Sequence, residues 1–176
     1  QTKIGSTFCL PCLTGTFQNE FGSSGCKDCP KGYSNGVTEA KKCNECKVGR
    51  YNELEKEAAC KGCKAGQYSK EEGLDAENKC RKCPAGMYST AEGASSKSNC
   101  NACPPGKASN KIGNTKETDC IECKNNTVAQ TSGSSVCEAA EIGTVVLAGG
   151  AAVVSKYIIL LSLDRISALN LSILYI

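Results

Sequence analysis

Paired cysteines recur along most of the chain at two fixed spacings. A loop of 13 residues separates one C-x-x-C pair from the next in the first three cases, and a loop of 16 residues does so in the next three. A further 13 residues precede the single Cys137. Such self-similarity predicts an array of short structural repeats over residues 9–137. The seven pairs stand at positions 9/12, 26/29, 43/46, 60/63, 80/83, 100/103 and 120/123.

Large apolar side chains are too few to hold these repeats in a conventional core. All 15 cysteines lie within residues 1–137, where Leu, Ile, Val, Phe and Met together also number only 15. Burial of so little apolar surface does not offset the conformational entropy lost on ordering the chain. Covalent or metal cross-links must therefore supply much of the stability.

The second cysteine of each C-x-x-C pair begins a loop, and we call it the opening cysteine. A recurring turn signal follows it in each loop. The third residue is glycine in six loops and Asn126 in the last, which predicts a tight turn at positive φ. The fifth residue is aromatic in four loops, and we expect it to lie over an adjacent disulfide as a miniature core. The turn glycines are Gly15, Gly32, Gly49, Gly66, Gly86 and Gly106, and the aromatic residues are Phe17, Tyr51, Tyr68 and Tyr88.

The chain has an odd number of cysteines, and the last, Cys137, is single. This favours closure of each loop by its two flanking cysteines, because Cys137 would close the last loop and open no further one. This scheme uses 14 of the 15 cysteines and leaves Cys9 unpaired. Each closed loop of about 15 residues would contribute about 3 kcal/mol in the chain-entropy model. Pairing of first with third and second with fourth cysteines stays open, because sequence alone does not define connectivity. The favoured pairs are Cys12–Cys26, Cys29–Cys43, Cys46–Cys60, Cys63–Cys80, Cys83–Cys100, Cys103–Cys120 and Cys123–Cys137.

Zinc binding is the main alternative to disulfides, because spaced C-x-x-C pairs are also typical of four-cysteine zinc sites. Three features argue against it. Seven pairs and one single cysteine do not divide into sets of four, and the gaps do not alternate between lengths within and between sites. An apolar C-terminal segment also indicates the secretory route, where thiols oxidise. We therefore expect no metal site and no cofactor, with an intracellular zinc array as the alternative.

The motif C-x-x-C-P-x-G-x-Y at Cys80 to Tyr88 resembles the ephrin-receptor-like cysteine-rich repeat. A single loop is also similar to the first module of tumour-necrosis-factor-receptor repeats. The resemblance covers residues 9–137 and implies small disulfide-rich repeats that form an elongated rod of short β-ribbons and turns. The whole chain is similar to protist surface proteins of the ciliate immobilisation-antigen type, which combine C-x-x-C arrays with a hydrophobic C-terminal anchor signal.

The C-terminal part of the chain has the opposite composition, with no cysteine after Cys137. Residues 142–163 carry one charge, Lys156, in 22 residues, which is long enough to cross a membrane as an α-helix. We therefore expect a transmembrane or anchor helix there. A glycolipid-anchor signal and a buried helix of a fibre core are the alternatives. On this reading, residues 1–8 are the edge of a cut repeat, 138–141 a linker and 164–176 a short tail.

Several classes of function are excluded or disfavoured by composition. The chain has no histidine, so imidazole catalysis and histidine metal ligands are excluded. A net charge of +3 is too small to indicate nucleic-acid binding. No phosphate-binding glycine loop or nucleophile elbow is present in the sequence. We expect a protein that is not an enzyme.

The sequence therefore predicts a membrane-anchored protein of the cell surface, with residues 1–137 extracellular, that acts as a coat, antigen or adhesion stalk. Alternatives are the ectodomain fragment of a ligand-binding receptor and the subunit of an extracellular fibre. The expected partners are the membrane, protein or glycan ligands, and further copies of the chain. Asn125-Asn126-Thr127 is an N-glycosylation triplet, with Asn125 as the acceptor.

Overall fold

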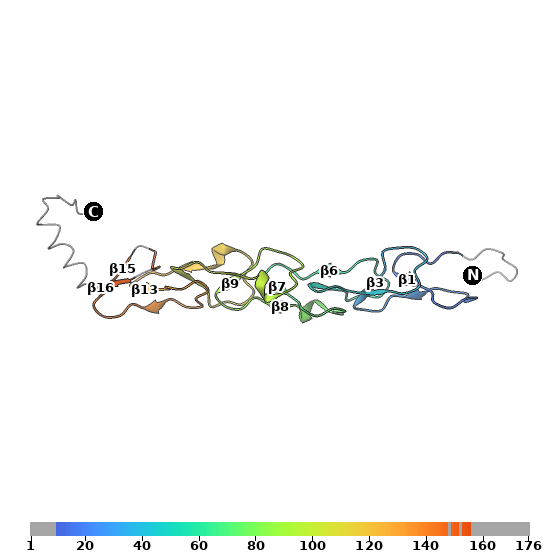
Figure 1. Cartoon of the computed structure of the whole chain (residues 1–176), viewed down its shortest axis with the longest axis horizontal. Helices are drawn as coiled ribbons and strands as arrows, with labels where there is room; N and C mark the ends of the chain where they lie inside the picture. Colours follow the sequence, from blue (N-terminus) through green and yellow to red (C-terminus); the bar gives the residue numbers. More distant parts are fainter. Residues whose placement is uncertain (1–9, 148, 152, 156–176) are drawn as a thin grey trace, which may run out of the picture. The chain divides into compact units, whose positions relative to one another are not determined.

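The two residues inside each C-x-x-C motif form a short β-strand from the second motif onward. In the computed structural model these strands pair with the two residues that follow each turn glycine, as Thr16 pairs with Asp28 and Phe17 with Lys27. The structure describes residues 10–147, 149–151 and 153–155 (Figure 1). The described part contains eight antiparallel two-stranded ribbons, six of which include the residues inside a C-x-x-C motif.

The chain divides into two compact units. Unit 1 comprises Gln1–Cys83, Ser89–Cys100 and Gly113–Thr115, and unit 2 comprises Pro84–Tyr88, Asn101–Ile112 and Lys116–Ile176. The rod shape implied by the family resemblance stays a prediction.

The ribbons of unit 1 are β1 (Thr16–Phe17) with β2 (Lys27–Asp28), β3 (Tyr33–Ser34) with β4 (Asn44–Glu45), β5 (Arg50–Tyr51) with β6 (Lys61–Gly62), and β7 (Gln67–Tyr68) with β8 (Arg81–Lys82). Those of unit 2 are β9 (Met87–Tyr88) with β10 (Asn101–Ala102), β11 (Lys107–Ala108) with β12 (Ile121–Glu122), β13 (Thr127–Val128) with β14 (Glu138–Ala139), and β15 (Thr144–Val146) with β16 (Val153–Ser155). The predicted short β-ribbons are therefore confirmed.

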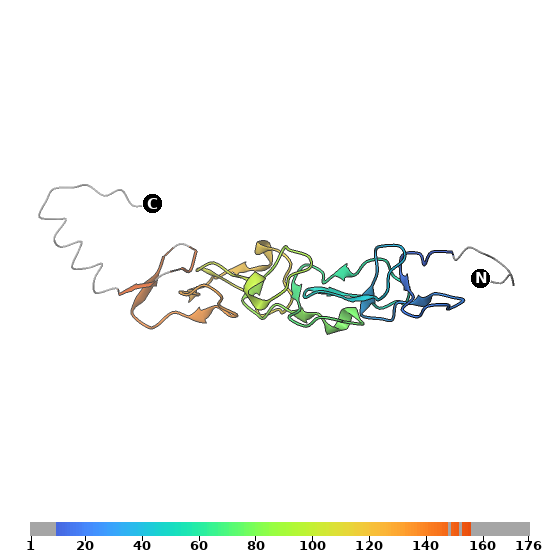
Figure 2. The same cartoon turned by 45° about the vertical axis from the view of Figure 1, so that its right-hand side comes forward.

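The three longer loops each contain one turn of 3-10 helix directly before the closing cysteine. These turns are η1 (Glu77–Lys79), η2 (Lys97–Asn99) and η3 (Glu117–Asp119), drawn as short coils in Figure 2. In η1, for example, the N–H of Cys80 donates to the carbonyl of Glu77. The three extra residues are thus taken up by one helical turn, and the ribbon that follows keeps its position relative to the cysteine.

The few large buried side chains pack against disulfides. Tyr51, which is 4% exposed, forms a cluster with Leu74 and the Cys63–Cys80 disulfide of the following loop. In unit 2, Ala108 takes the position equivalent to Tyr51 and packs against Cys123. The predicted miniature core is therefore confirmed for Tyr51, whereas Phe17, Tyr68 and Tyr88 are only half-buried.

Residues 138–155 form an eighth repeat that lacks cysteines. Ala140 stands where an opening cysteine would be, and its N–H donates to the carbonyl of Asn126 at 3.0 Å. The N–H of Cys123 makes the equivalent bond to Gly106 at 2.9 Å. Gly143, three residues after Ala140, has a φ of 83°, as a turn glycine does.

This repeat corrects two predictions about the C-terminal region. The predicted linker 138–141 contains strand β14, and the predicted helix over 142–163 is wrong for residues 144–146 and 153–155, which form the ribbon β15–β16. Hydropathy alone suggested the helix, but positive-φ glycines such as Gly149 and a run of β-branched valines favour a ribbon.

Residues 1–8, Cys9 and the segments 156–163 and 164–176 lie outside the described residues. Among the helices that the described ranges contain, none has the length and apolar character needed to cross a membrane.

The Tyr51 cluster leads to a first prediction. The substitution Tyr51→Ala should destabilise the third and fourth loops by roughly 3 kcal/mol, because it removes a buried aromatic ring that packs against the Cys63–Cys80 disulfide. Native-state hydrogen exchange at the Cys63 amide, which is bonded to the carbonyl of Gly49, measures this opening free energy. The control Leu54→Ala removes a side chain that is 52% exposed and should change it little. Equal effects of the two substitutions would contradict the role assigned to Tyr51.

Candidate functional site

Seven disulfides close the loops, and each joins the two cysteines that flank one loop. They are Cys12–Cys26, Cys29–Cys43, Cys46–Cys60, Cys63–Cys80, Cys83–Cys100, Cys103–Cys120 and Cys123–Cys137. Sequence separations are 14 residues in the shorter loops and 17 in the longer ones, as in Cys12–Cys26 and Cys63–Cys80. This is the flanking scheme, not the pairing of first with third cysteines.

A zinc array requires free thiolates, and these cysteines do not offer them. The seven bonds consume every cysteine from Cys12 to Cys137. Within the ranges that the structure describes, no group of three or more acidic, histidine or cysteine side chains is arranged to hold a metal ion. The described cysteines thus act as cross-links.

The turn glycines are required for two separate reasons. Their φ values lie in the left-handed region, as at Gly15 with 76° and Gly106 with 83°. A Cβ atom added to Gly15 would also lie 2.0 Å from the carbonyl oxygen of Lys56, and one added to Gly106 would lie 2.1 Å from that of Gly149. Each of these carbonyls belongs to the loop two repeats further on. The positive φ follows from the sequence pattern, but the close approach between loops does not.

Backbone hydrogen bonds join each turn glycine to the next loop. The N–H of Gly32 donates to the carbonyl of Asn52 at 2.8 Å, and the N–H of Cys46 donates back to the carbonyl of Gly32 at 2.8 Å. The same two bonds recur in unit 2, where Gly106 donates to Ala129 at 2.8 Å and accepts from Cys123 at 2.9 Å. Consecutive loops are therefore joined by backbone hydrogen bonds.

A second pair of backbone hydrogen bonds joins the same neighbouring loops. We call the two pairs together the ladder. The carbonyl of Cys29 accepts from the N–H of Lys56 at 2.8 Å, and the N–H of Asn35 donates to the carbonyl of Glu57 at 3.2 Å. In unit 2 the N–H of Gly133 donates to the carbonyl of Cys103 at 2.8 Å, and the N–H of Ser109 donates to that of Ser134 at 3.3 Å. The opening cysteine therefore has a double role, with its sulfur in its own loop and its carbonyl bonded to the next.

The tenth residue of each loop was missed by sequence reasoning. It has positive φ in each of the seven disulfide-closed loops, and from the second loop onward its N–H donates to the carbonyl of the opening cysteine of the preceding loop. A second column of glycines at the same period was the available signal, interrupted only where Glu39 and Lys56 adopt φ values of 59° and 64°. The remaining members of this column are Gly22, Gly73, Gly93, Gly113 and Gly133.

Small polar residues at the sixth position of the loops were also missed. Asn35 is 2% exposed, and its Nδ2 donates to the carbonyl of Thr16 in the preceding loop at 2.8 Å. Its Oδ1 accepts from the N–H of Val37 at 3.1 Å, so both ends of the amide are bonded. Asn52 repeats this arrangement with Tyr33. The buried members of this column are Asn35, Asn52, Ser69, Ser89 and Ser109.

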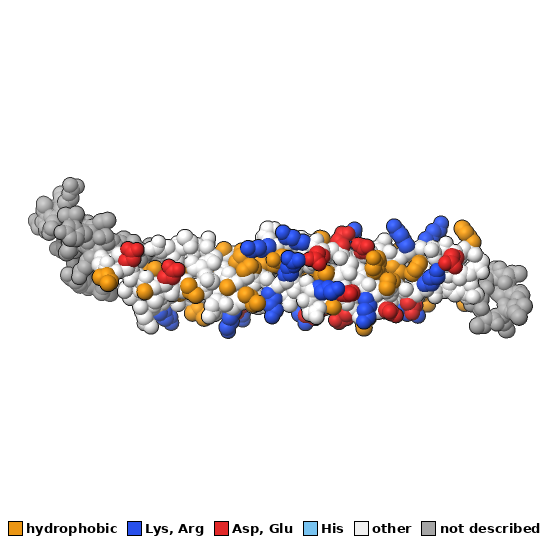
Figure 3. All heavy atoms as spheres, turned by 90° about the horizontal axis from the view of Figure 1, so that it is seen from below, with side chains coloured by type: hydrophobic (Ala, Val, Ile, Leu, Met, Phe, Trp, Pro, Cys, Tyr) orange, Lys and Arg blue, Asp and Glu red, His pale blue; other side chains and the backbone are white. Residues whose placement is uncertain are grey.

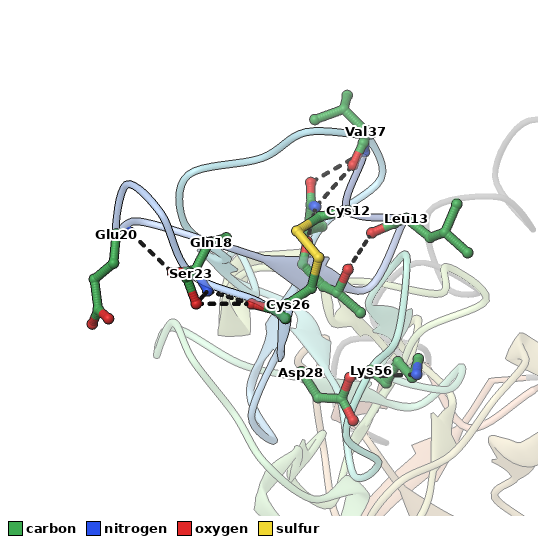
Figure 4. The surroundings of a disulfide bond; sticks show 12 residues. Cys12, Leu13, Gln18, Glu20, Ser23, Cys26, Asp28, Val37 and Lys56 are labelled. Carbon is green, nitrogen blue, oxygen red and sulfur yellow. Dashed lines mark hydrogen bonds and ion pairs between the residues drawn. A yellow bond between two sulfur atoms is a disulfide. The ribbon is translucent and has the colours of Figure 1, made fainter. Parts of the chain in front are cut away.

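The first described loop uses its sixth residue differently. The amide of Gln18 donates to Ser23 Oγ at 2.6 Å and to the carbonyl of Gly25, all within the loop closed by Cys12–Cys26 (Figure 4). Its Oε1 accepts from the N–H of Glu20 at 2.9 Å. The side chain of Gln18 thus stabilises its own loop by hydrogen bonds and, within the described residues, does not bond to a neighbouring loop.

One small polar network joins the third and fourth loops. Glu77 accepts a hydrogen bond from the hydroxyl of Tyr51 at 3.2 Å and forms an ion pair with Lys64 at 2.7 Å. The hydrogen bond and charge of Lys64 lower the pKa of the Glu77 carboxyl, and Glu77 in turn raises the pKa of Lys64. Burial, together with Glu77, raises the pKa of the Tyr51 hydroxyl.

The exposed surface is mixed in charge. Figure 3 shows lysine and arginine side chains interspersed with acidic ones on the face that it presents, with apolar side chains between them. Exposed ion pairs of this kind, such as Arg81 with Glu71 at 2.7 Å, contribute little to stability. The exposed apolar side chains include Leu13 and Val37 in unit 1 and Ile112 and Ile121 in unit 2.

Together, the disulfides, ribbons and ladder define a cysteine-rich repeat protein. The sequence profile of the family described as tyrosine-protein kinase ephrin type A/B receptor-like matches residues 1–46 and 73–120. The chain belongs to this ephrin-receptor-like family. No curated protein matches the chain.

Two glycines of unit 2 offer a matched test of the ladder. Gly106 and Gly143 both have a φ of 83°, but an added Cβ meets a carbonyl only at Gly106. Gly143→Ala should cost about 1–2 kcal/mol of unfolding free energy from the backbone alone. Gly106→Ala should cost a further 1–3 kcal/mol or so, because a neighbouring loop must also shift. Chemical denaturation with the disulfides intact measures both, and similar losses would show that the close approach is unimportant.

The Glu77 network predicts a dependence of stability on pH. Because the pKa of Glu77 is lowered on folding, its stabilisation is fully present above its ordinary value of 4.5 and is lost as the pH falls through the folded-state pKa. Glu77→Gln should therefore remove part of the acid-induced destabilisation of the protein. Thermal unfolding of both proteins between pH 7 and pH 2 tests this, and parallel pH profiles would contradict it.

Proposed function

We propose that this chain is a non-enzymatic extracellular protein that acts as a surface coat, antigen or adhesion stalk. Its work is mechanical and steric, since a covalently closed framework presents a variable outer surface. The family membership and the seven disulfides support an extracellular location, because disulfides persist in oxidising compartments.

The observation that carries this proposal is the separation of framework from surface. Opening cysteines, turn glycines and, apart from Gln18, sixth-position polar residues are buried and recur from loop to loop. The strand residues inside the C-x-x-C motifs are mostly exposed and differ freely, from Lys27–Asp28 to Arg81–Lys82 and Ile121–Glu122. A surface that changes while its frame stays constant suits a coat or antigen.

A receptor ectodomain fragment is the second candidate, and the name of the matching family favours it. Exposed apolar side chains such as Leu13 and Val37 would then contact a protein ligand. Saturable binding of the soluble protein to intact cells, lost on substitution of exposed side chains, would favour the receptor over the coat.

Membrane attachment is a separate proposal. It rests on the apolar sequence after Lys156 rather than on the span first predicted, since residues 144–146 and 153–155 are strands. Detergent phase partition of the full chain tests it: recovery in the detergent phase supports attachment, and recovery in the aqueous phase contradicts it. Similarity to ciliate surface antigens also stays a proposal, and the extracellular fibre stays an alternative.

The test of the main proposal combines location with thiol state. Antibodies against residues 10–147 should label unpermeabilised cells, and the 14 loop cysteines should resist alkylation until the protein is reduced. Labelling only after permeabilisation, together with cysteines that alkylate without reduction, would overturn the extracellular assignment and favour the intracellular zinc array instead.

A further inference from the structure

The turn of the seventh loop differs from the six turns before it. Each of the six turn glycines is buried, whereas Asn126, at the equivalent position, is exposed. Gly106 is covered because the carbonyl of Gly149 lies 2.1 Å from where its Cβ would be. Asn126 has a φ of 60°, so its own Cβ takes the place that a neighbouring loop takes elsewhere.

The backbone of this turn is nevertheless held firmly. The N–H of Ala140 donates to the carbonyl of Asn126 at 3.0 Å, and the N–H of Thr127 donates to the carbonyl of Lys124 at 3.2 Å. The hydroxyl of Thr127 bonds to the same carbonyl at 2.6 Å. Asn125, with a φ of 54°, lies at the exposed apex of the turn. The turn therefore presents an asparagine side chain on an anchored support.

We propose that Asn125 carries an N-linked glycan on this exposed turn. The triplet Asn125-Asn126-Thr127 meets the requirement of the acceptor sequence. In the transfer, Nδ2 of Asn125 attacks C1 of an oligosaccharide on a polyprenyl-diphosphate donor. The new C–N bond replaces the C–O bond, the diphosphate leaves with the electron pair, and the amide nitrogen loses a proton.

The structural context makes this site suitable for a bulky group. In the first six loops the equivalent turn is packed against a neighbouring loop, and a glycan one residue away would lie beside that contact. In the seventh loop the turn is exposed, so the glycan covers backbone that neighbouring loops cover elsewhere. The inference rests on the proposed extracellular function, because the transfer takes place in the secretory lumen.

The experiment expresses the full chain behind a cleavable secretion signal in a eukaryotic host. Total and secreted protein are treated with peptide-N-glycosidase in ¹⁸O-water, which marks each former glycan site as labelled aspartate, and peptides are analysed by mass spectrometry. Asn125→Asp removes the acceptor amide and keeps a residue that tolerates positive φ. Asn126→Gly and Thr127→Ser both preserve the triplet and serve as matched controls, with a parallel incubation in ¹⁸O-water without the glycosidase to measure spontaneous deamidation.

We expect the label at position 125 in the unsubstituted protein and in both controls, and its complete loss in Asn125→Asp. The sequence has a second acceptor triplet, Asn170-Leu171-Ser172. Disulfide-bonded protein that lacks the label at Asn125, or carries it only at Asn170, would overturn the proposal. Either result would leave the extracellular assignment intact if the cysteines are protected from alkylation, so the two failures are distinguishable.

Discussion

In both units, a carbonyl of one loop lies against the turn of the loop two repeats before it. This contact leaves no room for a side chain at Gly32, where an added Cβ would lie 2.3 Å from the carbonyl oxygen of Gly73. From the third loop to the seventh, the tenth residue supplies this carbonyl and has positive φ, as at Lys56 with 64° and Gly73 with 67°. Backbone hydrogen bonds join loops at the same turns, as where the N–H of Gly32 donates to the carbonyl of Asn52 at 2.8 Å.

Backbone bonds and disulfides together replace the missing hydrophobic core. Each disulfide restricts the unfolded chain within one loop, and the ladder then joins that loop to its neighbour. Neither term depends on large apolar side chains, so the outward residues are free to be charged or apolar. The eighth repeat shows the ladder operating without a disulfide, because Ala140 makes the bond to Asn126 that a cysteine makes elsewhere.

The features that repeat at the cysteines were predictable from the sequence. The loop boundaries, the turn at Gly15 and its equivalents, and the short ribbons all follow from spacing and residue type. The sixth and tenth positions were missed because their roles lie between loops, and Asn35 bonds to Thr16 only once two loops stack. Residues 138–155 were misread because they carry no cysteine, and their high hydropathy suits a ribbon edge as well as a helix.

The most direct test of the account is a disulfide map of the unreduced protein. Trypsin cuts inside two neighbouring motifs, after Lys61 and after Arg81, so it separates the two cysteines of each pair. The account predicts that peptide 62–64 is recovered linked to peptide 80–81 through Cys63 and Cys80. Recovery of peptide 57–61 linked to peptide 80–81 would show that the disulfides cross between loops and would contradict the repeat architecture.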